Sequence, residues 1–160
     1  MRIAALIVFA TVAVVGAQTA SSQGANPVQL EATAAFEQAY AASFYTFDAC
    51  GDGVAGQLYR KALIARFAQC PFTAASRDRF RQRTALQRRK SSTLIRQEIE
   101  QNGGLPPRLE GMSLTCHEQR TSADYRSFRD RLERFAAGTA PAEAVLPEPC
   151  GADTISPYSR

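Results

Sequence analysis

Four cysteines are the residues best placed to do chemistry in this chain, and the chemistry that they predict is disulfide formation. Cys50, Cys70, Cys116 and Cys150 are even in number and lie far apart in the sequence. A zinc site built from four thiolates usually contains cysteines separated by only a few residues, and this chain has no such pair. Two disulfides are therefore expected if the chain reaches an oxidising compartment.

The N-terminus predicts that export. A positive residue, Arg2, precedes residues 3–15, which are apolar apart from one threonine, and small residues follow at Gly16 and Ala17. This is the pattern of a secretory signal peptide, and we predict cleavage after Ala17, or alternatively after Ala20. The apolar run is shorter than the roughly 20 residues that span a bilayer. We therefore expect a periplasmic or secreted protein with no transmembrane anchor after cleavage.

Two short motifs resemble ligand-binding loops but lack what those loops need. Residues 51–56 match the G-x-G-x-x-G pattern, but that motif binds phosphate only after a strand, and here a helical pattern precedes it. The segment from Asp48 resembles the start of a calcium loop, but the bidentate acid at its twelfth position is replaced by Tyr59. We expect a glycine-rich turn between two helices, with Asp52 as a helix cap.

His117 is the only histidine, and it does not belong to a recognisable catalytic motif. A Cys–His nucleophile would need Cys116 to be free, and neither a Gly-x-Ser-x-Gly nor a His-Glu-x-x-His motif occurs. No catalytic residue, metal ligand or cofactor is therefore predicted. An enzyme is less favoured than a binding protein, and a small cell-envelope hydrolase that uses His117 is kept as the alternative.

The elements that must position these residues are helices. Apolar residues recur at helical spacing, and no segment alternates with period two for long enough to predict a strand. The composition, with 45% apolar and 21% charged residues, is that of a globular domain. We predict an all-α fold, most simply a four-helix up-down bundle. The expected segments are a signal peptide (1–17), a flexible leader (18–25), a disulfide-linked domain (26–150) and a loose C-terminal tail (151–160).

The four helices are expected to begin at residue 26, at 52 or 54, at 73, and at 121 or 122. They are expected to end near residues 48, 69 and 102 and at the glycine at 138, and residues 139–160 are expected to be extended. The second helix is apolar on several sides, which predicts a central position. The expected core comprises Phe36, Tyr40, Phe44, Phe47, Val54, Leu58, Leu63, Ile64, Phe67, Phe80, Leu94, Ile95, Ile99, Tyr125, Phe128, Leu132 and Phe135.

The helices also constrain the disulfide pairing. Cys50 and Cys70 flank the second helix, which at about 18 residues is roughly 27 Å long. Bridged cysteines have Cα atoms only about 4.4–6.8 Å apart, so these two cannot pair unless the helix breaks. In an up-down bundle, the third helix returns the chain to the Cys50 end. The sequence therefore predicts the pairs Cys50–Cys116 and Cys70–Cys150.

The expected third helix is unusually rich in arginine within a chain whose net charge is only +4. One interpretation is a solvated helix whose long side chains cover a thin apolar stripe. The other is an anion-binding surface, for which the candidate residues are Arg77, Arg81, Arg88, Arg89 and Lys90.

The leading prediction is a non-enzymatic binding protein that uses this basic helix and the loop 103–116. An exported protein rarely meets nucleic acid, so the expected partner is an acidic protein, a lipid phosphate or an acidic polysaccharide. A third hypothesis, beside the binding protein and the hydrolase, is a periplasmic chaperone or inhibitor of another exported protein.

Overall fold

The computed structural model describes residues 29–102 and 116–156. The predicted signal peptide, the leader and most of the loop 103–116 lie outside these residues. For Ile95 and Ile99, which were expected in the core, the structure describes the backbone but not the side chains. The described part is mostly helical and contains no strand, which confirms an all-α fold. Its named elements are α1 (Ala35–Ser43), the π-helical turn η1 (Phe44–Asp48), α2 (Gly53–Gln69), α3 (Ala74–Asn102), α5 (Ala123–Ala136) and the 3-10 helix η2 (Ala142–Ala144).

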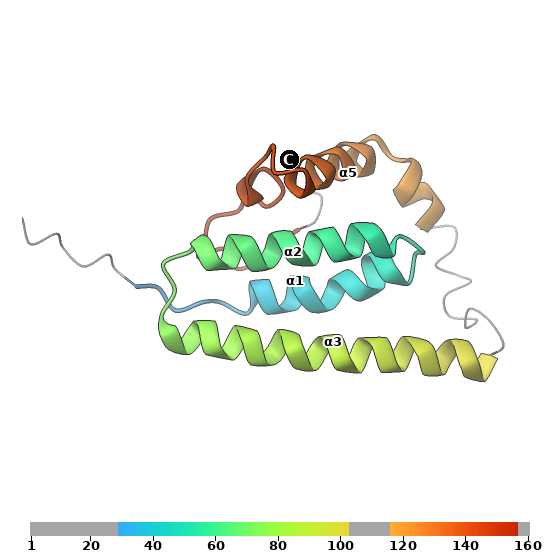
Figure 1. The fold of residues 1–160 in the computed structure, drawn as a ribbon, viewed down its shortest axis with the longest axis horizontal. Helices are drawn as coiled ribbons and strands as arrows, with labels where there is room; N and C mark the ends of the chain where they lie inside the picture. The colour runs from blue at the N-terminus through green and yellow to red at the C-terminus, as the bar shows by residue number, and fades with distance from the viewer. Residues whose placement is uncertain (1–28, 103–115, 157–160) are drawn as a thin grey trace, which may run out of the picture.

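The helices are arranged with α1 between α2 and α3, and with α5 on the other side of α2 (Figure 1). Following the colours of Figure 1, α1 and α3 run in one direction, while α2 and α5 run in the opposite one. The C-terminal end of α3 extends beyond the first turn of α2. Within the described segments, no helix is both long enough and apolar enough to cross a bilayer.

The first helix starts later than the sequence predicts. Residues 29–33 are not helical; instead Leu30 forms a parallel bridge with Phe72, in which its amide donates to the Pro71 carbonyl (2.8 Å) and its carbonyl accepts from Thr73 (3.1 Å). The predicted start at residue 26 is therefore wrong. The long-range bridge outweighs the local N-capping pattern on which that prediction was based.

The turn before α2 explains the glycine-rich motif. Gly51 has φ +76°, a left-handed conformation that favours glycine. The Asp52 side chain caps α2 by accepting a hydrogen bond from the Ala55 amide (3.0 Å), as predicted. A Cβ atom at Gly56 would lie 3.1 Å from the Phe47 Cβ and closer still to the Asp48 carboxylate. The glycines therefore serve a turn and a close helix contact.

The core contains two aromatic clusters, one between α1, α2 and α3 and the other between η1, α2 and α5. In the first, Phe67 of α2 stacks on Phe80 of α3 with ring centroids 4.0 Å apart, and Phe36 of α1 meets both rings edge-on. In the second, Phe47 stacks on Phe128 of α5 with centroids 5.6 Å apart. Such pairs contribute about 0.5–1.5 kcal/mol each beyond their buried area. The four aromatic residues predicted for residues 36–47 are all buried, which confirms that stripe.

Arg60 links η1 to α2 within this core. Its guanidinium forms an ion pair with Asp48 (3.1 Å) and lies 4.2 Å from the centroid of the Phe44 ring. Burial raises the pKa of Asp48, and the nearby Arg60 charge opposes that shift. The pair is mostly buried, so removing either partner would leave the other charged group without compensation.

The C-terminal part contains more structure than the sequence predicts. Ser122 caps α5 by accepting from the Tyr125 amide (3.1 Å), as expected, but residues 116–121 form an additional helical segment before it. Residues 139–150 do not form the predicted extended tail, because η2 interrupts them and Val145 and Leu146 are each 1% exposed. Further along, Ile155 packs against the core. Residues 139–150 are rich in proline, which favours an extended chain, so the short helix η2 was not predicted.

Both disulfides join the pairs that the sequence predicts. Cys50–Cys116 has a Cα–Cα distance of 5.4 Å, and Cys70–Cys150 has one of 5.6 Å. The two bridges lie at opposite ends of α2, and they join cysteines that are 66 and 80 residues apart in the sequence. On the chain-entropy model each contributes about 4 kcal/mol by restricting the unfolded chain.

Candidate anion-binding surface and groove of α3

Arg77 serves the fold at the beginning of α3. Its guanidinium donates hydrogen bonds to the carbonyls of Ala68 (3.2 Å), Cys70 (2.7 Å) and Phe72 (3.1 Å). The last carbonyls of a helix have no partner within it, and the negative end of the helix dipole favours a cation there. Arg77, one of the predicted anion-binding residues, therefore stabilises the C-terminal end of α2.

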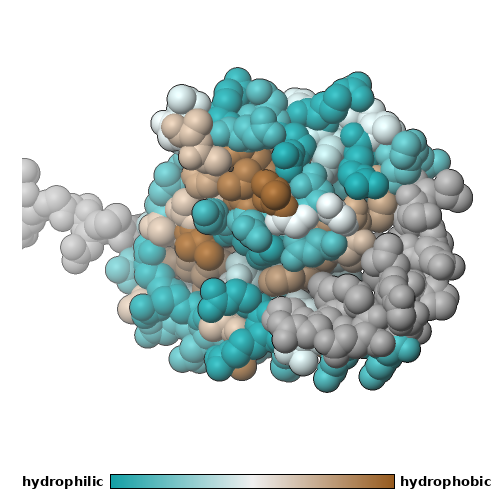
Figure 2. Space-filling model, turned by 45° about the vertical axis from the view of Figure 1, so that its right-hand side comes forward, coloured by the Kyte–Doolittle hydropathy of each residue, from teal (hydrophilic) through white to brown (hydrophobic). Residues whose placement is uncertain are grey.

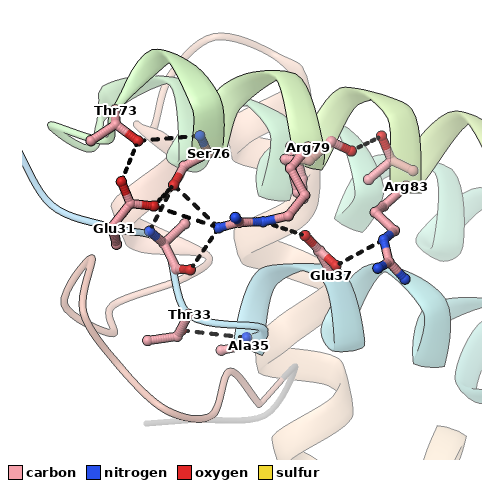
Figure 3. Close-up of polar contacts among 11 residues, drawn as sticks. Glu31, Thr33, Ala35, Glu37, Thr73, Ser76, Arg79 and Arg83 are labelled. Atoms are coloured by element: carbon pink, nitrogen blue, oxygen red, sulfur yellow. Dashed lines mark hydrogen bonds and ion pairs between the residues drawn. The ribbon is translucent and has the colours of Figure 1, made fainter.

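Arg79 and Arg83 meet acidic residues of the preceding segments. Figure 3 shows the Arg79 side chain between Glu31 and Glu37, with ion-pair distances of 3.8 and 3.7 Å. Arg83 forms a longer ion pair with the same Glu37 (4.0 Å). Hydrogen bonds from Ser76 and then Thr73 hold the pKa of Glu31 below its usual value, with a smaller contribution from Arg79. These contacts hold α1 and its leading segment against α3.

The second half of the basic stretch is different. Arg88, Arg89 and Lys90 are consecutive and exposed on α3, and we call them the distal basic cluster. They lie beyond Arg79 and Arg83, which contact acids of α1 and its leading segment. The Arg89 Nε donates to the carbonyl of Ala85 on its own helix (3.4 Å). The predicted residues therefore fall into two groups. Arg77, which closes the end of α2, and Arg81 both line a groove, and Arg88, Arg89 and Lys90 form an exposed cationic surface.

That groove lies between α2 and α3 and contains the remaining predicted residue, Arg81. Its volume is about 420 Å³. Arg81 is exposed and pairs with Asp78, one turn earlier on the same helix. The groove is lined by Ile64, Phe67, Ala68, Arg77, Phe80, Arg81 and Thr84.

Ile64 is the groove residue that sequence reasoning placed incorrectly. It was expected in the core with Val54 and Leu94, but these three side chains are 48%, 61% and 49% exposed. The apolar residues of α2 lie on several sides of the helix, whereas α1 and α5 cover only some of those sides. An apolar residue on a remaining side, such as Ile64, is therefore exposed. On the face drawn in Figure 2, apolar residues likewise reach the surface in separate patches among hydrophilic ones.

A second groove, of about 310 Å³, lies between α1 and α3. It is more polar than the first, because Glu37, Gln38, Arg83 and Gln87 all contribute to its lining. Its carboxylate and guanidinium groups already pair with each other across the groove. This arrangement is suited to holding α1 on α3.

His117 lines neither groove. It is exposed in the segment 116–121, next to the disulfide-bonded Cys116, and its carbonyl accepts from the Thr121 hydroxyl (3.0 Å). Because Cys116 is bonded to Cys50, it does not provide a free thiol for a Cys–His nucleophile. Among the described residues, no group of three metal-ligating side chains comes together. These contacts give the hydrolase alternative no support.

Comparisons with known proteins add no function to this geometry. No family model, no curated protein and no solved structure matches the chain.

Proposed function

We propose that this chain is an exported, non-enzymatic helical binding protein that engages an anionic partner through the distal basic cluster. The observation that carries the proposal is the exposure of Arg88, Arg89 and Lys90, three consecutive cations at the surface of α3. Earlier on the same helix, Arg77 and Arg79 contact carbonyls and carboxylates of the same molecule. Clustered exposed cations attract anionic partners and raise their local concentration.

Export is part of the proposal. Residues 1–17 are proposed as a cleaved signal peptide, and the mature chain as periplasmic or secreted. The two disulfides support this, since such bonds persist mainly in oxidising compartments. We also interpret α1, α2, α3 and α5 as a four-helix up-down bundle, because the chain reverses direction from each of these helices to the next.

The partner classes that fit the cluster are an acidic polysaccharide, a lipid phosphate and an acidic protein. They can be compared with three probes: heparin, vesicles containing phosphatidylglycerol, and poly-glutamate. The oxidised mature chain should bind at least one probe, and binding should weaken steeply as salt rises from about 0.01 to 0.15 M. Binding that does not change with salt would exclude a surface-charge mechanism.

A matched pair of variants tests the location of the site. The triple variant R88A/R89A/K90A removes the distal basic cluster, and K61A/R126A/R134A removes three exposed cations elsewhere. Each exposed cation near an anionic surface contributes about 1 kcal/mol, so the first variant should lose at least about tenfold in affinity. The second should remain close to the unmodified chain. Equal losses in the two variants would contradict a localised site.

A further inference from the structure

The α2–α3 groove has an apolar floor and a cationic wall. Phe67, Phe80 and Ile64 provide the apolar surface, and Arg77 and Arg81 stand on the α3 side. Among the described residues, none in this lining is acidic, although the second groove contains Glu37. We propose that the groove binds a single-chain amphiphile with an aliphatic tail and a carboxylate head group, such as a fatty-acid anion.

The volume favours a small ligand. A groove of about 420 Å³ falls within the roughly 300–1,000 Å³ typical of small-molecule sites. Ile64 keeps 48% of its surface exposed beside two buried aromatic rings, so an aliphatic chain lying on it would remove apolar area from water. Of the lining residues that the structure describes, Thr84 alone is polar and uncharged, which offers few hydrogen-bonding groups to a polar tail.

The two arginines have different roles in this site. Arg77 is fixed by its three carbonyl contacts, so it contributes positive charge to the wall from a fixed position. Arg81 is exposed, and its ion pair within the described residues is a local one, with Asp78 on the preceding turn. An exposed pair of this kind is weak, so Arg81 can turn to a ligand carboxylate at little cost. The structure therefore assigns head-group binding to Arg81.

This site is separate from the distal basic cluster and does not depend on the proposed function. None of Arg88, Arg89 and Lys90 belongs to the lining of the groove. The variant R88A/R89A/K90A should therefore bind the amphiphile normally, and a variant at Arg81 should bind the anionic partner of α3 nearly normally. Failure of one proposal can thus be recognised without affecting the other.

The probe for the site is dodecanoate, titrated as a monomer into the oxidised chain in a calorimeter. Each methylene buried in an apolar site contributes about a fourfold gain in affinity. Dodecanoate, with two more methylenes, should therefore bind about 15-fold more tightly than decanoate, and more tightly than dodecanol. The cation dodecyltrimethylammonium should bind least, because its head group is repelled by both arginines. Equal binding of the cation and the anion would overturn the assignment.

Three single variants locate the ligand. Ala68 is exposed and lines the groove, so Ala68→Trp should fill the site and abolish dodecanoate binding while circular dichroism shows an unchanged fold. Arg81→Gln should weaken binding about fivefold, as expected for one partly exposed ion pair. The control Arg126→Gln removes an exposed arginine far along the sequence on α5 and should leave binding unchanged. Undiminished binding by the folded Ala68→Trp variant would overturn the proposal.

Discussion

The two halves of α3 contain similar numbers of cationic side chains but use them differently. In the first half, Arg77 and Arg79 reach carbonyls and carboxylates of the preceding segments, and Phe80 lies in the core. In the second half, the distal basic cluster and Leu94 are exposed. The density of arginine along a helix is therefore a poor guide to a binding surface. In the first half, acids and the end of α2 lie within reach of the arginines and occupy them in the fold.

The largest expected difference between the two halves concerns their apolar side chains. Phe80→Ala removes a ring that stacks on Phe67 and meets Phe36, and we expect a loss of about 3–5 kcal/mol in the free energy of unfolding. Leu94→Ala, in the second half, should change it by no more than about 0.5 kcal/mol. Urea unfolding of the oxidised variants measures both. Similar losses would mean that the second half is packed as tightly as the first.

A smaller effect is expected from the arginines themselves. Arg77→Ala removes three hydrogen bonds to the carbonyls of Ala68, Cys70 and Phe72, and we expect a loss of about 2 kcal/mol. Arg77→Lys should not restore the loss, because an ammonium group lacks the planar fork that reaches three carbonyls. Arg88→Ala should leave the unfolding free energy almost unchanged. A large loss from Arg88→Ala would show that the distal cluster is structural.

The ion pairs between α1 and α3 should contribute less. Glu37 faces both Arg79 and Arg83, so Glu37→Gln should lower the unfolding free energy by about 0.5–1 kcal/mol at low salt. Near 1 M salt, where charges are screened beyond about 3 Å, the difference from the unmodified chain should largely disappear. A loss that persists at high salt would point to packing rather than charge.

The smallest expected effect is the pH dependence at Glu31. Its pKa is lowered in the folded chain, so the ionised carboxylate is the form that the fold favours. Its contribution should be present above the ordinary value of 4.5 and should be lost as the pH falls through the lowered pKa. Glu31→Gln should therefore be slightly less stable than the unmodified chain at neutral pH, and the two should converge in acid. A constant difference across this range would contradict the assignment.

The features predicted correctly from the sequence depend on local patterns and on simple geometry. The spacing of Phe36, Tyr40, Phe44 and Phe47 predicts a buried face, and Asp52 is recognisable as a cap. For the disulfides, the length of α2 excludes a Cys50–Cys70 bond, and the expected up-down order of the helices then selects the pairing. These arguments use local patterns and one simple assumption about topology.

The features predicted wrongly depend on contacts between distant segments. Leu30 was expected within a helix, but its backbone pairs with Phe72, and no local signal marks that partner. The assignment of Arg77 to a binding surface stays a prediction, but its contacts with the carbonyls of Ala68, Cys70 and Phe72 could not be read from the sequence. Ile64 was assigned to the core because nothing in its pattern shows that α2 and α3 leave a groove beside it.

The division of α3 can be tested most directly by mapping a bound anion onto the helix. Backbone amide signals of the ¹⁵N-labelled, oxidised chain would be followed while the tightest-binding of heparin, anionic vesicles and poly-glutamate is added. We expect the changes to concentrate at residues 85–91, around the distal basic cluster, and to leave residues 74–84 largely unaffected. Changes centred on residues 74–84, or spread evenly over the basic residues of α5, would contradict the account.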